Sequence, residues 1–571
     1  MRRLNIAIIS GGSGNDALIK GLNEIYNDCN ITVIVNAYDN GKSTGICRHI
    51  TNTLGVSDIR KNHIRMYKSI NKHPDKRLVE FYDNRYDFSP GNECTEILEL
   101  LNMWGLDNLS EFAINFFDNP QSKCFRFNDF NVSNIIYSQM YTMFGYESTN
   151  KYFCNLLGID DFVILNSFDN VYISAETLNG TVLDDEGKIV EFKNDDDRIT
   201  HLNYTIDYPT VGLNPKAISA IKSADLIVIS TGTFWSSILP TIEYLDFYKH
   251  INKSNAKKVW AINNEFDNDS YGVTSNDFIR IMENVGLDVS QFTILENSDA
   301  IAPLREPNDS YKIVEMSMGN VDGKHIGKKY ATAIFKIYYN LIEKYDKIIF
   351  DFDDTIWSRD ERNDLINKSI ENLKLINCCF GEKAIIISGN SYSSIQSKLF
   401  KVFGTDLKEL NINIWADANS TLYVGNDVVD FISELSIGDK YIYIKKYLSD
   451  IFDINSTINS SSRPVCLKIK PLKPKERLLL NAYLNDYLFD RLDMSHCKAI
   501  CTGTTTIDIL HKLNNKKIIL EQKFNANERI LYIGDEVDCG NDYEISHMCD
   551  TFIHTSGVVE TNLLIKLLGE I

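Results

Sequence analysis

The sequence predicts an α/β protein built on two doubly wound parallel sheets, the second carrying an inserted α+β cap. Seven short apolar runs rich in β-branched residues support this fold class, because such runs are typical of strands buried on both faces of a parallel sheet. Stretches with helical spacing separate the runs, and ligands bind at the carboxyl ends of strands in folds of this kind. The predicted strands are 5–10, 30–37, 224–231, 257–264, 346–353, 382–390 and 528–536.

The length of 571 residues exceeds what one hydrophobic core supports, so we expect two large domains. Residues 327–345 show helical spacing, and a strand that leads into an acidic loop starts at Ile348. The boundary is therefore placed near 340–346, which gives two Rossmann-like domains at 1–340 and 341–571. The long stretch between Ser388 and Lys516 leaves room for a cap at about 415–500.

The composition is that of an ordinary globular chain, with 44% hydrophobic and 24% charged residues, which excludes collagenous and disordered classes. The net charge of -19 disfavours nucleic acid as the main partner. Twelve scattered cysteines without a CxxC pair indicate a reducing cytoplasm, and no apolar run approaches the roughly 18 residues of a membrane span. The sequence leaves the oligomeric state open, and a homo-oligomer is one alternative.

The run FDFDDT (350–355) places two carboxylates, Asp351 and Asp353, two residues apart directly after a strand. One can attack a phosphorus atom while its neighbour moves a proton. A capped strand-to-helix turn is the alternative interpretation, since Asp and Thr are common in such turns. Three later features favour the chemical interpretation: Ser388 ends the next strand, Lys516 and Lys517 follow further on, and the acidic run 534–542 follows another strand.

This order of motifs resembles the haloacid dehalogenase superfamily of phosphohydrolases over about 345–571. The resemblance implies that Asp351 is the nucleophile and Asp353 the general acid/base. It also implies a Mg²⁺ site, with Ser388 and a lysine binding the phosphoryl oxygens. The implied metal residues are Asp351, Asp353, Asp535 and Asp542.

Lys516 best fits the phosphate-binding lysine of that resemblance, and Lys517, Lys468 and Lys470 remain alternatives. The segment IWADANSTLY (414–423) is similar to an element of the sugar-phosphatase branch, although Ser420 replaces its usual Gly. The segment GNDYEI (540–545) is similar to a closing motif of phosphomannomutases and sugar-phosphate phosphatases. Hydrolysis and mutase chemistry both remain open, because both begin with the same aspartyl-phosphate.

In the N-terminal half, the run GGSGNDA (11–17) follows the first strand and opens a helix, and Asp39 ends the second strand. Glycines in such a turn let the backbone approach a phosphate, which the helix N-terminus attracts. Strand-to-helix turns also need glycine for steric reasons alone. An NAD-dependent oxidoreductase is a weak alternative, because it rests on this run only.

Three segments, 36–48, 55–62 and 214–242, resemble in order the motifs of the CofD/YvcK family, which joins 2-phospho-L-lactate transferases with UDP-sugar-binding proteins. The segments 130–141 and 263–277 are similar to later parts of that family. Asn40 and Lys42 depart from its pattern, which puts a transfer step through paired carboxylates in doubt. The nucleotide- or phosphate-binding residues that the resemblance implies are Gly12, Gly14, Asp39, Asn40, Ser43, Thr44, Arg48, Asp58, Arg60, Asn62, Thr231, Gly232, Thr233 and Ser236.

The expected function is therefore bifunctional. A Mg²⁺-dependent phosphohydrolase domain would act on a small phosphorylated metabolite, such as a sugar phosphate. The other domain would bind a nucleotide or UDP-sugar-like ligand, or transfer a phospho group. The alternatives are a regulatory nucleotide-sugar-binding protein with marginal catalysis and a phosphosugar mutase.

Overall fold

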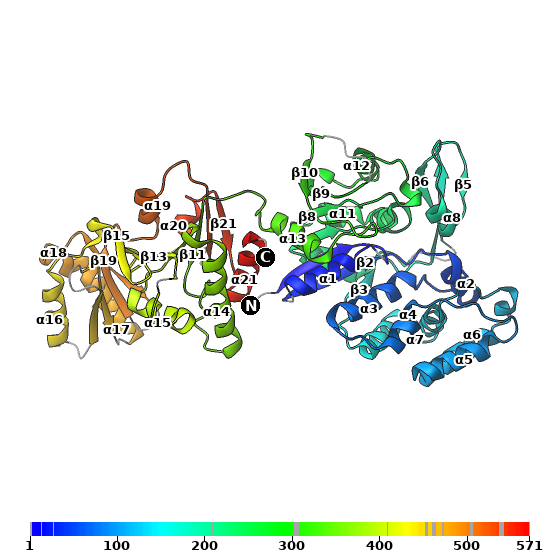
Figure 1. Ribbon diagram of the computed structural model, residues 1–571, viewed down its shortest axis with the longest axis horizontal. Coiled ribbons are helices and arrows are strands. Elements are labelled where there is room, and N and C mark those ends of the chain that lie inside the picture. The colour runs from blue at the N-terminus through cyan, green and yellow to red at the C-terminus, as the bar shows by residue number, and fades with distance from the viewer. Residues whose placement is uncertain are drawn as a thin grey trace. The chain divides into compact units, whose positions relative to one another are not determined.

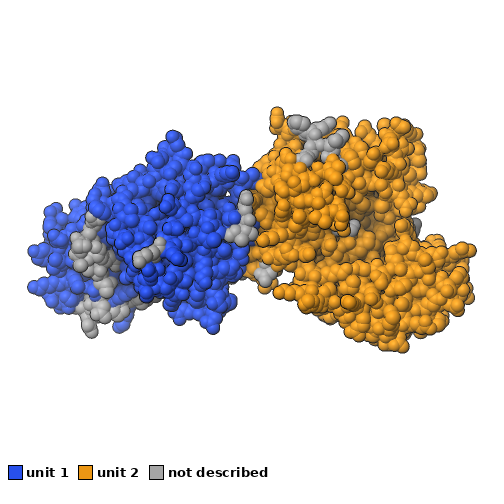
Figure 2. Space-filling view, viewed as in Figure 1, with its two compact units in different colours: residues 1–2, 339–571 blue, residues 3–338 orange. Residues whose placement is uncertain are grey.

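Two seven-stranded sheets organise the chain, and the predicted fold class is confirmed. The chain divides into an N-terminal unit, Arg3–Tyr338, and a C-terminal unit that begins at Tyr339, beside the boundary predicted near 340 (Figure 2). The computed structural model describes residues 3–12, 14–26, 28–206, 211–301, 308–407, 409–451, 455–459, 464–470, 473–502, 506–535 and 542–569.

All strands of the N-terminal sheet run parallel, in the order β10-β9-β8-β7-β1-β2-β3 (Figure 1). Ile6 of β1 pairs with Ile31 of β2 on one side and with Leu226 of β7 on the other. The crevice beyond the carboxyl ends of β1 and β7 is therefore the switch point where open α/β sheets bind ligands. The strands are β1 (Leu4–Ile9), β2 (Cys29–Val35), β3 (Val163–Leu165), β7 (Leu226–Ile229), β8 (Lys257–Ala261), β9 (Phe292–Asn297) and β10 (Lys312–Met316).

Helices cover this sheet, so its central strands are buried, as their continuous apolar runs predict. Helix α1 packs closely on α13, because Gly21 and Gly327 let the two backbones approach. The helices that flank this sheet are α1 (Asp16–Ile25), α9 (Pro215–Ser223), α10 (Leu239–Glu243), α11 (Tyr248–Asn252), α12 (Ser275–Asn284) and α13 (Gly327–Tyr338).

A helical insertion connects β2 to β3, and a small antiparallel sheet follows it. The helices of the insertion are α2 (Lys42–Thr51), α3 (Ser57–Ile70), α4 (Lys76–Asp83), α5 (Glu93–Trp104), α6 (Ser110–Asp118) and α7 (Val132–Leu157). The small sheet has the order β5-β4-β6 and consists of β4 (Val171–Thr177), β5 (Val182–Leu183) and β6 (Ile199–Ile206), with α8 (Glu186–Glu191) beside it.

The C-terminal sheet has the order β15-β14-β13-β12-β11-β20-β21. It is parallel from β13 to β21, and β14 and β15 form an antiparallel edge. The strands are β11 (Lys347–Asp351), β12 (Ala384–Ile387), β13 (Asn413–Ala416), β14 (Thr421–Val424), β15 (Asp427–Phe431), β20 (Ile530–Gly534) and β21 (Thr551–His554). The helices are α14 (Asn363–Cys379), α15 (Tyr392–Phe403), α19 (Lys517–Lys523), α20 (Tyr543–Ser546) and α21 (Val558–Gly569).

The cap is a four-stranded antiparallel sheet with helices on one face. Its limits differ from the predicted 415–500, because β14 and β15 pair with the core sheet and the last cap strand ends at His511. The elements are α16 (Tyr441–Ile451), β16 (Asn455–Asn459), β17 (Cys466–Lys470), α17 (Pro474–Tyr483), α18 (Phe489–Arg491), β18 (Cys497–Thr502) and β19 (Thr506–His511). Across the described residues, no helix combines the length and apolarity needed to cross a membrane.

Candidate functional site

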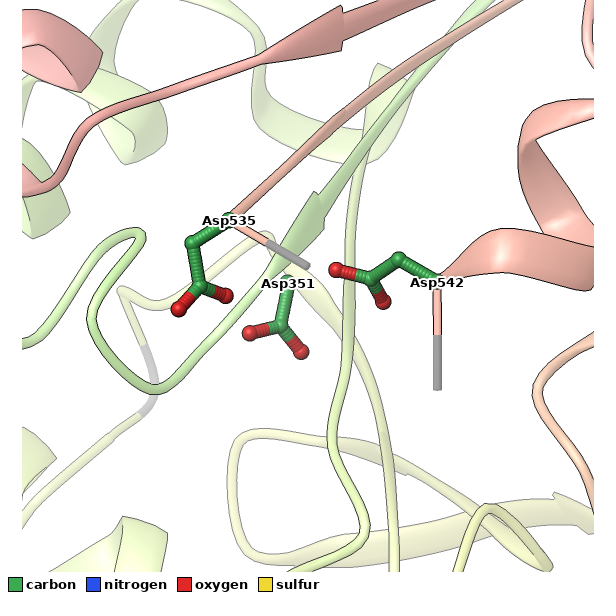
Figure 3. Close-up of side chains that lie close together, drawn as sticks. All are labelled: Asp351, Asp535 and Asp542. Carbon is green, nitrogen blue, oxygen red and sulfur yellow. The ribbon is translucent and has the colours of Figure 1, made fainter. Parts of the chain in front are cut away.

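Three carboxylates meet at the carboxyl ends of β11 and β20. Asp351 is the last residue of β11, and Asp535 directly follows β20, its parallel neighbour. Asp542 precedes α20 and turns back toward both. One oxygen of each carboxylate lies within 4.8 Å of the others, and Figure 3 shows the three side chains pointing toward one another. Oxygen ligands grouped in this way suit a hard cation such as Mg²⁺.

Lys516 is the counter-ion of this group. Its Nζ lies 2.5 Å from Asp351 Oδ1 and 2.5 Å from Asp542 Oδ1. Burial disfavours the charged lysine, but the two carboxylates outweigh burial and raise its pKa above the usual range. Burial also raises the pKa of Asp351, to about 7, although Lys516 opposes that shift.

Two of the three other candidate lysines have different partners. Lys517 pairs with Glu521 on the surface of α19, and Lys468 pairs with Asp508 within the cap sheet. Among the described contacts of these lysines, only those of Lys516 include the predicted nucleophile. The geometry therefore selects Lys516 from the set that the sequence left open.

We expect Lys516→Met to lower the free energy of unfolding in EDTA by about 3–5 kcal/mol, because it leaves buried carboxylates without their cation. Urea denaturation would measure this loss, and added Mg²⁺ should restore part of it. Lys517→Met is the matched control, since its exposed pair contributes at most about 0.5 kcal/mol. Equal stability of the two variants in EDTA would show that Lys516 does not neutralise the acidic group.

Asp353, two residues after Asp351, is not one of the three grouped carboxylates. Asn390 Nδ2 donates to Asp353 Oδ2 at 2.5 Å, and Lys398 Nζ lies 3.5 Å from Asp353 Oδ1. Arg359 Nη2 is 3.9 Å from the same carboxylate. The structure thus separates the predicted acid/base from the metal-ligand set in which the sequence also placed it.

Ser388 follows β12, the other neighbour of β11, and its side chain is buried. Its backbone N–H donates to the Trp415 carbonyl at 2.9 Å, and its Oγ accepts from the Asn390 N–H at 3.1 Å. Asn390, which the sequence analysis missed, therefore connects Ser388 to Asp353. Its place three residues after the end of β12 was the available signal.

Tyr532 was also missed. Its hydroxyl donates to Asp542 Oδ1 at 2.5 Å and accepts from Lys516 Nζ at 3.2 Å. The side chain is buried within β20, so its hydroxyl needs a partner inside the protein. A tyrosine inside a buried apolar strand therefore indicated a buried hydrogen bond, but the sequence did not show which residue is its partner.

The N-terminal glycine loop is held against the segment that follows β7. A Cβ at Gly14 would overlap the Thr231 carbonyl, and one at Gly12 would overlap the Asp58 carboxylate. Thr231 Oγ1 donates to the Gly14 carbonyl at 2.6 Å. Protein packing therefore requires a glycine at this position even without a ligand, and the approach of Gly14 to a phosphate stays a prediction.

Gly14→Ala should lower the free energy of unfolding by about 1–3 kcal/mol even without a ligand, because the new methyl group meets backbone. Gly232→Ala is the control from the facing loop, where a Cβ would make only ordinary contact with Ile238. Thermal denaturation would compare the two. Equal melting temperatures would contradict the tight packing at Gly14.

Hydrogen bonds connect residues within the loop after β7 and join this loop to the segment after β8. Gly232 N–H donates to Asn263 Oδ1 at 3.2 Å, and Ser236 Oγ donates to Thr233 Oγ1 at 2.8 Å. A cavity of about 230 Å³ opens beside these loops at the carboxyl ends of β1, β7 and β8. It is lined by Gly14, Ala17, 231–233, 263–267 and 322–325.

Asp39 and Asp58 lie near a third carboxylate, Glu186 of α8. Burial, Asp39 and Asp58 together raise the pKa of Glu186 well above its usual range. Asn40 Oδ1 accepts from the Glu186 N–H at 2.7 Å, and Lys61 Nζ lies 3.6 Å from Asp58 Oδ1. The sequence analysis missed Glu186 and Lys61, because no local motif connects α8 to the loop at 39–41.

The two arginines predicted to bind phosphate are engaged within the protein. Arg48 Nη1 donates to the Tyr38 and Asp39 carbonyls at 3.1 Å each. Arg60 Nη1 donates to the Tyr82 carbonyl, and burial lowers the pKa of Arg60 to about 10. Both guanidinium groups therefore support the loop and the helical insertion, which corrects their predicted placement toward a ligand.

The remaining predicted polar residues also have protein partners. Asn134 Nδ2 donates to Ser43 Oγ at 3.0 Å and lies 3.4 Å from Thr44 Oγ1. Asn15 Nδ2 donates to Asn62 Oδ1 at 2.9 Å. The structure thus brings the glycine loop and the segments at 39–62 and 231–236 to one edge of the sheet.

The structure defines an α/β protein with two doubly wound sheets and a candidate ligand site on each of them. One sheet carries a glycine loop beside a cavity, and the other carries three aspartates grouped around a lysine. The chain belongs to the CofD family, whose model, described as 2-phospho-L-lactate transferase CofD, matches residues 6–329. The resemblance noted in the sequence is therefore confirmed for the N-terminal half.

Known proteins similar to this chain include the gluconeogenesis factor of Listeria monocytogenes, 24% identical over 324 residues, which are 55% of this chain and 84% of that protein. A solved Bacillus halodurans protein is 19% identical, covering 58% of this chain and 100% of its own, with a TM-score of 0.45. A haloacid dehalogenase-like hydrolase from Bacteroides thetaiotaomicron is 10% identical, covering 39% and 100%, with a TM-score of 0.30.

Proposed function

We propose that the C-terminal unit is a Mg²⁺-dependent phosphohydrolase that acts through an aspartyl-phosphate on Asp351. The observation that carries this proposal is the contact of Lys516 Nζ with both Asp351 and Asp542, inside a group of three carboxylates. A buried lysine there can bind a phosphoryl oxygen while it holds the nucleophile in position. The substrate is a small phosphate monoester, and a sugar phosphate is the favoured class.

In the first step, an Asp351 oxygen attacks phosphorus and the bond from phosphorus to the leaving oxygen breaks. Asp353 supplies the proton that the leaving oxygen takes up. In the second step, water attacks the aspartyl-phosphate, Asp353 accepts a proton from that water, and inorganic phosphate leaves. Asp351 is regenerated, and Asp353 is again protonated for the next cycle.

Mg²⁺ fits the donor set of this site, because Asp351, Asp535 and Asp542 offer hard carboxylate oxygens grouped within 4.8 Å. The ion, when bound, would neutralise charge on the phosphoryl group. Ser388 and Lys516 would orient the phosphoryl oxygens from the two sides of β11. Asn390 positions Asp353 through the hydrogen bond between their side chains.

For the N-terminal unit we propose binding of a nucleotide or nucleotide-sugar, with its phosphates at the glycine loop and its remainder in the adjoining cavity. The support is the cavity at the switch point of the parallel sheet. Regulation by such a ligand, without transfer chemistry, is the second candidate. It is favoured by Asn40, which stands at a position where the family commonly has a second carboxylate. The amide oxygen of Asn40 accepts a hydrogen bond from the Glu186 backbone N–H.

We further propose that the protein acts in the cytoplasm, in keeping with the eleven described cysteines, all of which are free thiols.

The test combines two measurements on the full chain. Phosphate release from sugar phosphates, polyol phosphates and p-nitrophenyl phosphate is measured with Mg²⁺ and with EDTA. Melting temperatures are measured with UDP-glucose and UDP-N-acetylglucosamine, because a ligand of the native state stabilises it. Release that requires Mg²⁺ supports the first proposal, and a raised melting temperature supports the second. No release from any ester, or no thermal shift, would overturn the corresponding proposal.

A further inference from the structure

The turn at 417–419, between β13 and β14, has an unusual backbone. Asp417, Ala418 and Asn419 are consecutive non-glycine residues with φ values of 50, 57 and 60°, and all three are buried. Left-handed backbone is sterically unfavourable for residues with a Cβ, and such strain concentrates at functional sites. The turn therefore directs attention to what surrounds it.

Hydrogen bonds connect this turn to both sides of the candidate phosphatase site. The Asp417 N–H donates to the Asn390 carbonyl at 2.8 Å, and the Asn390 side chain binds Asp353. The Ala418 carbonyl accepts a hydrogen bond from Asn514 Nδ2 at 2.6 Å, and Asn514 lies two residues before Lys516 in the chain. The turn is thus held between the segment of the acid/base and the segment of the phosphate-binding lysine.

The cap sheet meets the same turn. Ala418 packs with Cys466 of β17 and Leu510 of β19. Because side chains alternate along a strand, Lys468 and Asp508 share the sheet face of Cys466 and Leu510. Lys468 Nζ lies 3.7 Å from Asp508 Oδ2, so this cap face presents a polar pair near the turn.

Asn419 has an unfilled hydrogen-bonding position. The residue is 7% exposed, and its Oδ1 is buried without a hydrogen-bond partner. Buried polar atoms in native proteins normally have a partner, and an orphaned one requires an explanation. An amide oxygen is an acceptor only, so the missing partner must be a donor.

We propose that Asn419 is a specificity-determining residue, whose Oδ1 accepts a hydrogen bond from a hydroxyl of the leaving group. The proposal rests on the phosphohydrolase function proposed above and narrows its substrate class. The leaving group carries at least one hydroxyl, which Asn419 binds, and the polar pair of Lys468 and Asp508 lies on the cap face that meets the same turn. A leaving group without a hydroxyl gains nothing from Asn419.

The test compares Asn419→Gly with the wild-type chain on glucose 6-phosphate, sorbitol 6-phosphate and p-nitrophenyl phosphate. Glycine suits a left-handed backbone, so this variant removes the amide without adding strain. We expect kcat/KM for the two hydroxylated esters to fall about tenfold, the effect of one lost hydrogen bond in a buried site. Turnover of p-nitrophenyl phosphate should stay within about twofold, because its leaving group donates no hydrogen bond.

Ala418→Gly is the matched control, since it relaxes the same turn and removes no polar atom. Its ratio of activities between the hydroxylated esters and p-nitrophenyl phosphate should equal that of the wild type. If Asn419→Gly and Ala418→Gly lowered turnover of all three esters equally, the turn would have only a structural role, and the inference would be overturned.

Two results with the wild-type chain distinguish failure of this inference from failure of the proposed phosphohydrolase function. Hydrolysis of p-nitrophenyl phosphate but of neither hydroxylated ester would overturn the inference and leave the phosphohydrolase intact. Hydrolysis of no ester would overturn the phosphohydrolase function, and the inference with it.

Discussion

Asp351→Asn is expected to reduce Mg²⁺-dependent phosphate release by more than about 10⁴-fold, because an amide cannot attack phosphorus to form the acyl phosphate. The fold should persist, since Lys516 keeps its contact with Asp542 and the amide oxygen can still accept a hydrogen bond. Phosphate release under saturating Mg²⁺ measures the effect, and the melting temperature checks the fold.

Asp360→Asn is the control for that experiment, because it makes the same change at an exposed carboxylate paired with Arg362. It should leave turnover unchanged. If Asp351→Asn retained a tenth of wild-type turnover, the aspartyl-phosphate mechanism would be wrong.

Asp353→Asn is expected to lower turnover of alkyl phosphates by roughly 10²–10⁴-fold, because the amide keeps the shape of the carboxylate but cannot transfer a proton. Turnover of p-nitrophenyl phosphate should fall less, since nitrophenolate leaves without protonation. The affinity for Mg²⁺ should change little, because Asp353 is not part of the three-carboxylate group. Initial rates at a series of Mg²⁺ concentrations would measure both effects.

Asp535→Ala is the matched comparison, because it removes one of the three grouped carboxylates. It should weaken Mg²⁺ binding while Asp353→Asn does not. Equal loss of Mg²⁺ affinity in the two variants would mean that the acid/base and metal roles are wrongly divided between Asp353 and Asp535.

Features that depend on residues close together in the chain could be predicted from the sequence. Each of the seven predicted strands overlaps an observed one, from β1 to β20. The pair Asp351 and Asp353 could also be predicted, because it comes directly after an apolar strand. Strand periodicity and strand-end motifs are local properties, and they therefore survive folding unchanged.

Features that depend on distant partners could not be predicted in the same way. Arg60 belongs to a polar segment that suited phosphate binding, yet its guanidinium contacts the carbonyl of Tyr82, 22 residues away. Glu186 lies 146 residues from Asn40 and still binds it. A local pattern shows which residue types are present, but not which buried acceptor each one meets.

The sequence by itself determined the fold class, the CofD-like motifs and the place of Asp351 and Asp353 after a buried strand, because apolar periodicity and short motifs are encoded by neighbouring residues. The tertiary structure decided that Lys516 is the lysine at Asp351 and that packing, rather than a ligand alone, requires Gly14. It also showed the buried Asn419 oxygen that lacks a partner. The physical reason is that burial and hydrogen bonding depend on which segments the sheets and the cap bring together, and these segments lie far apart in the chain.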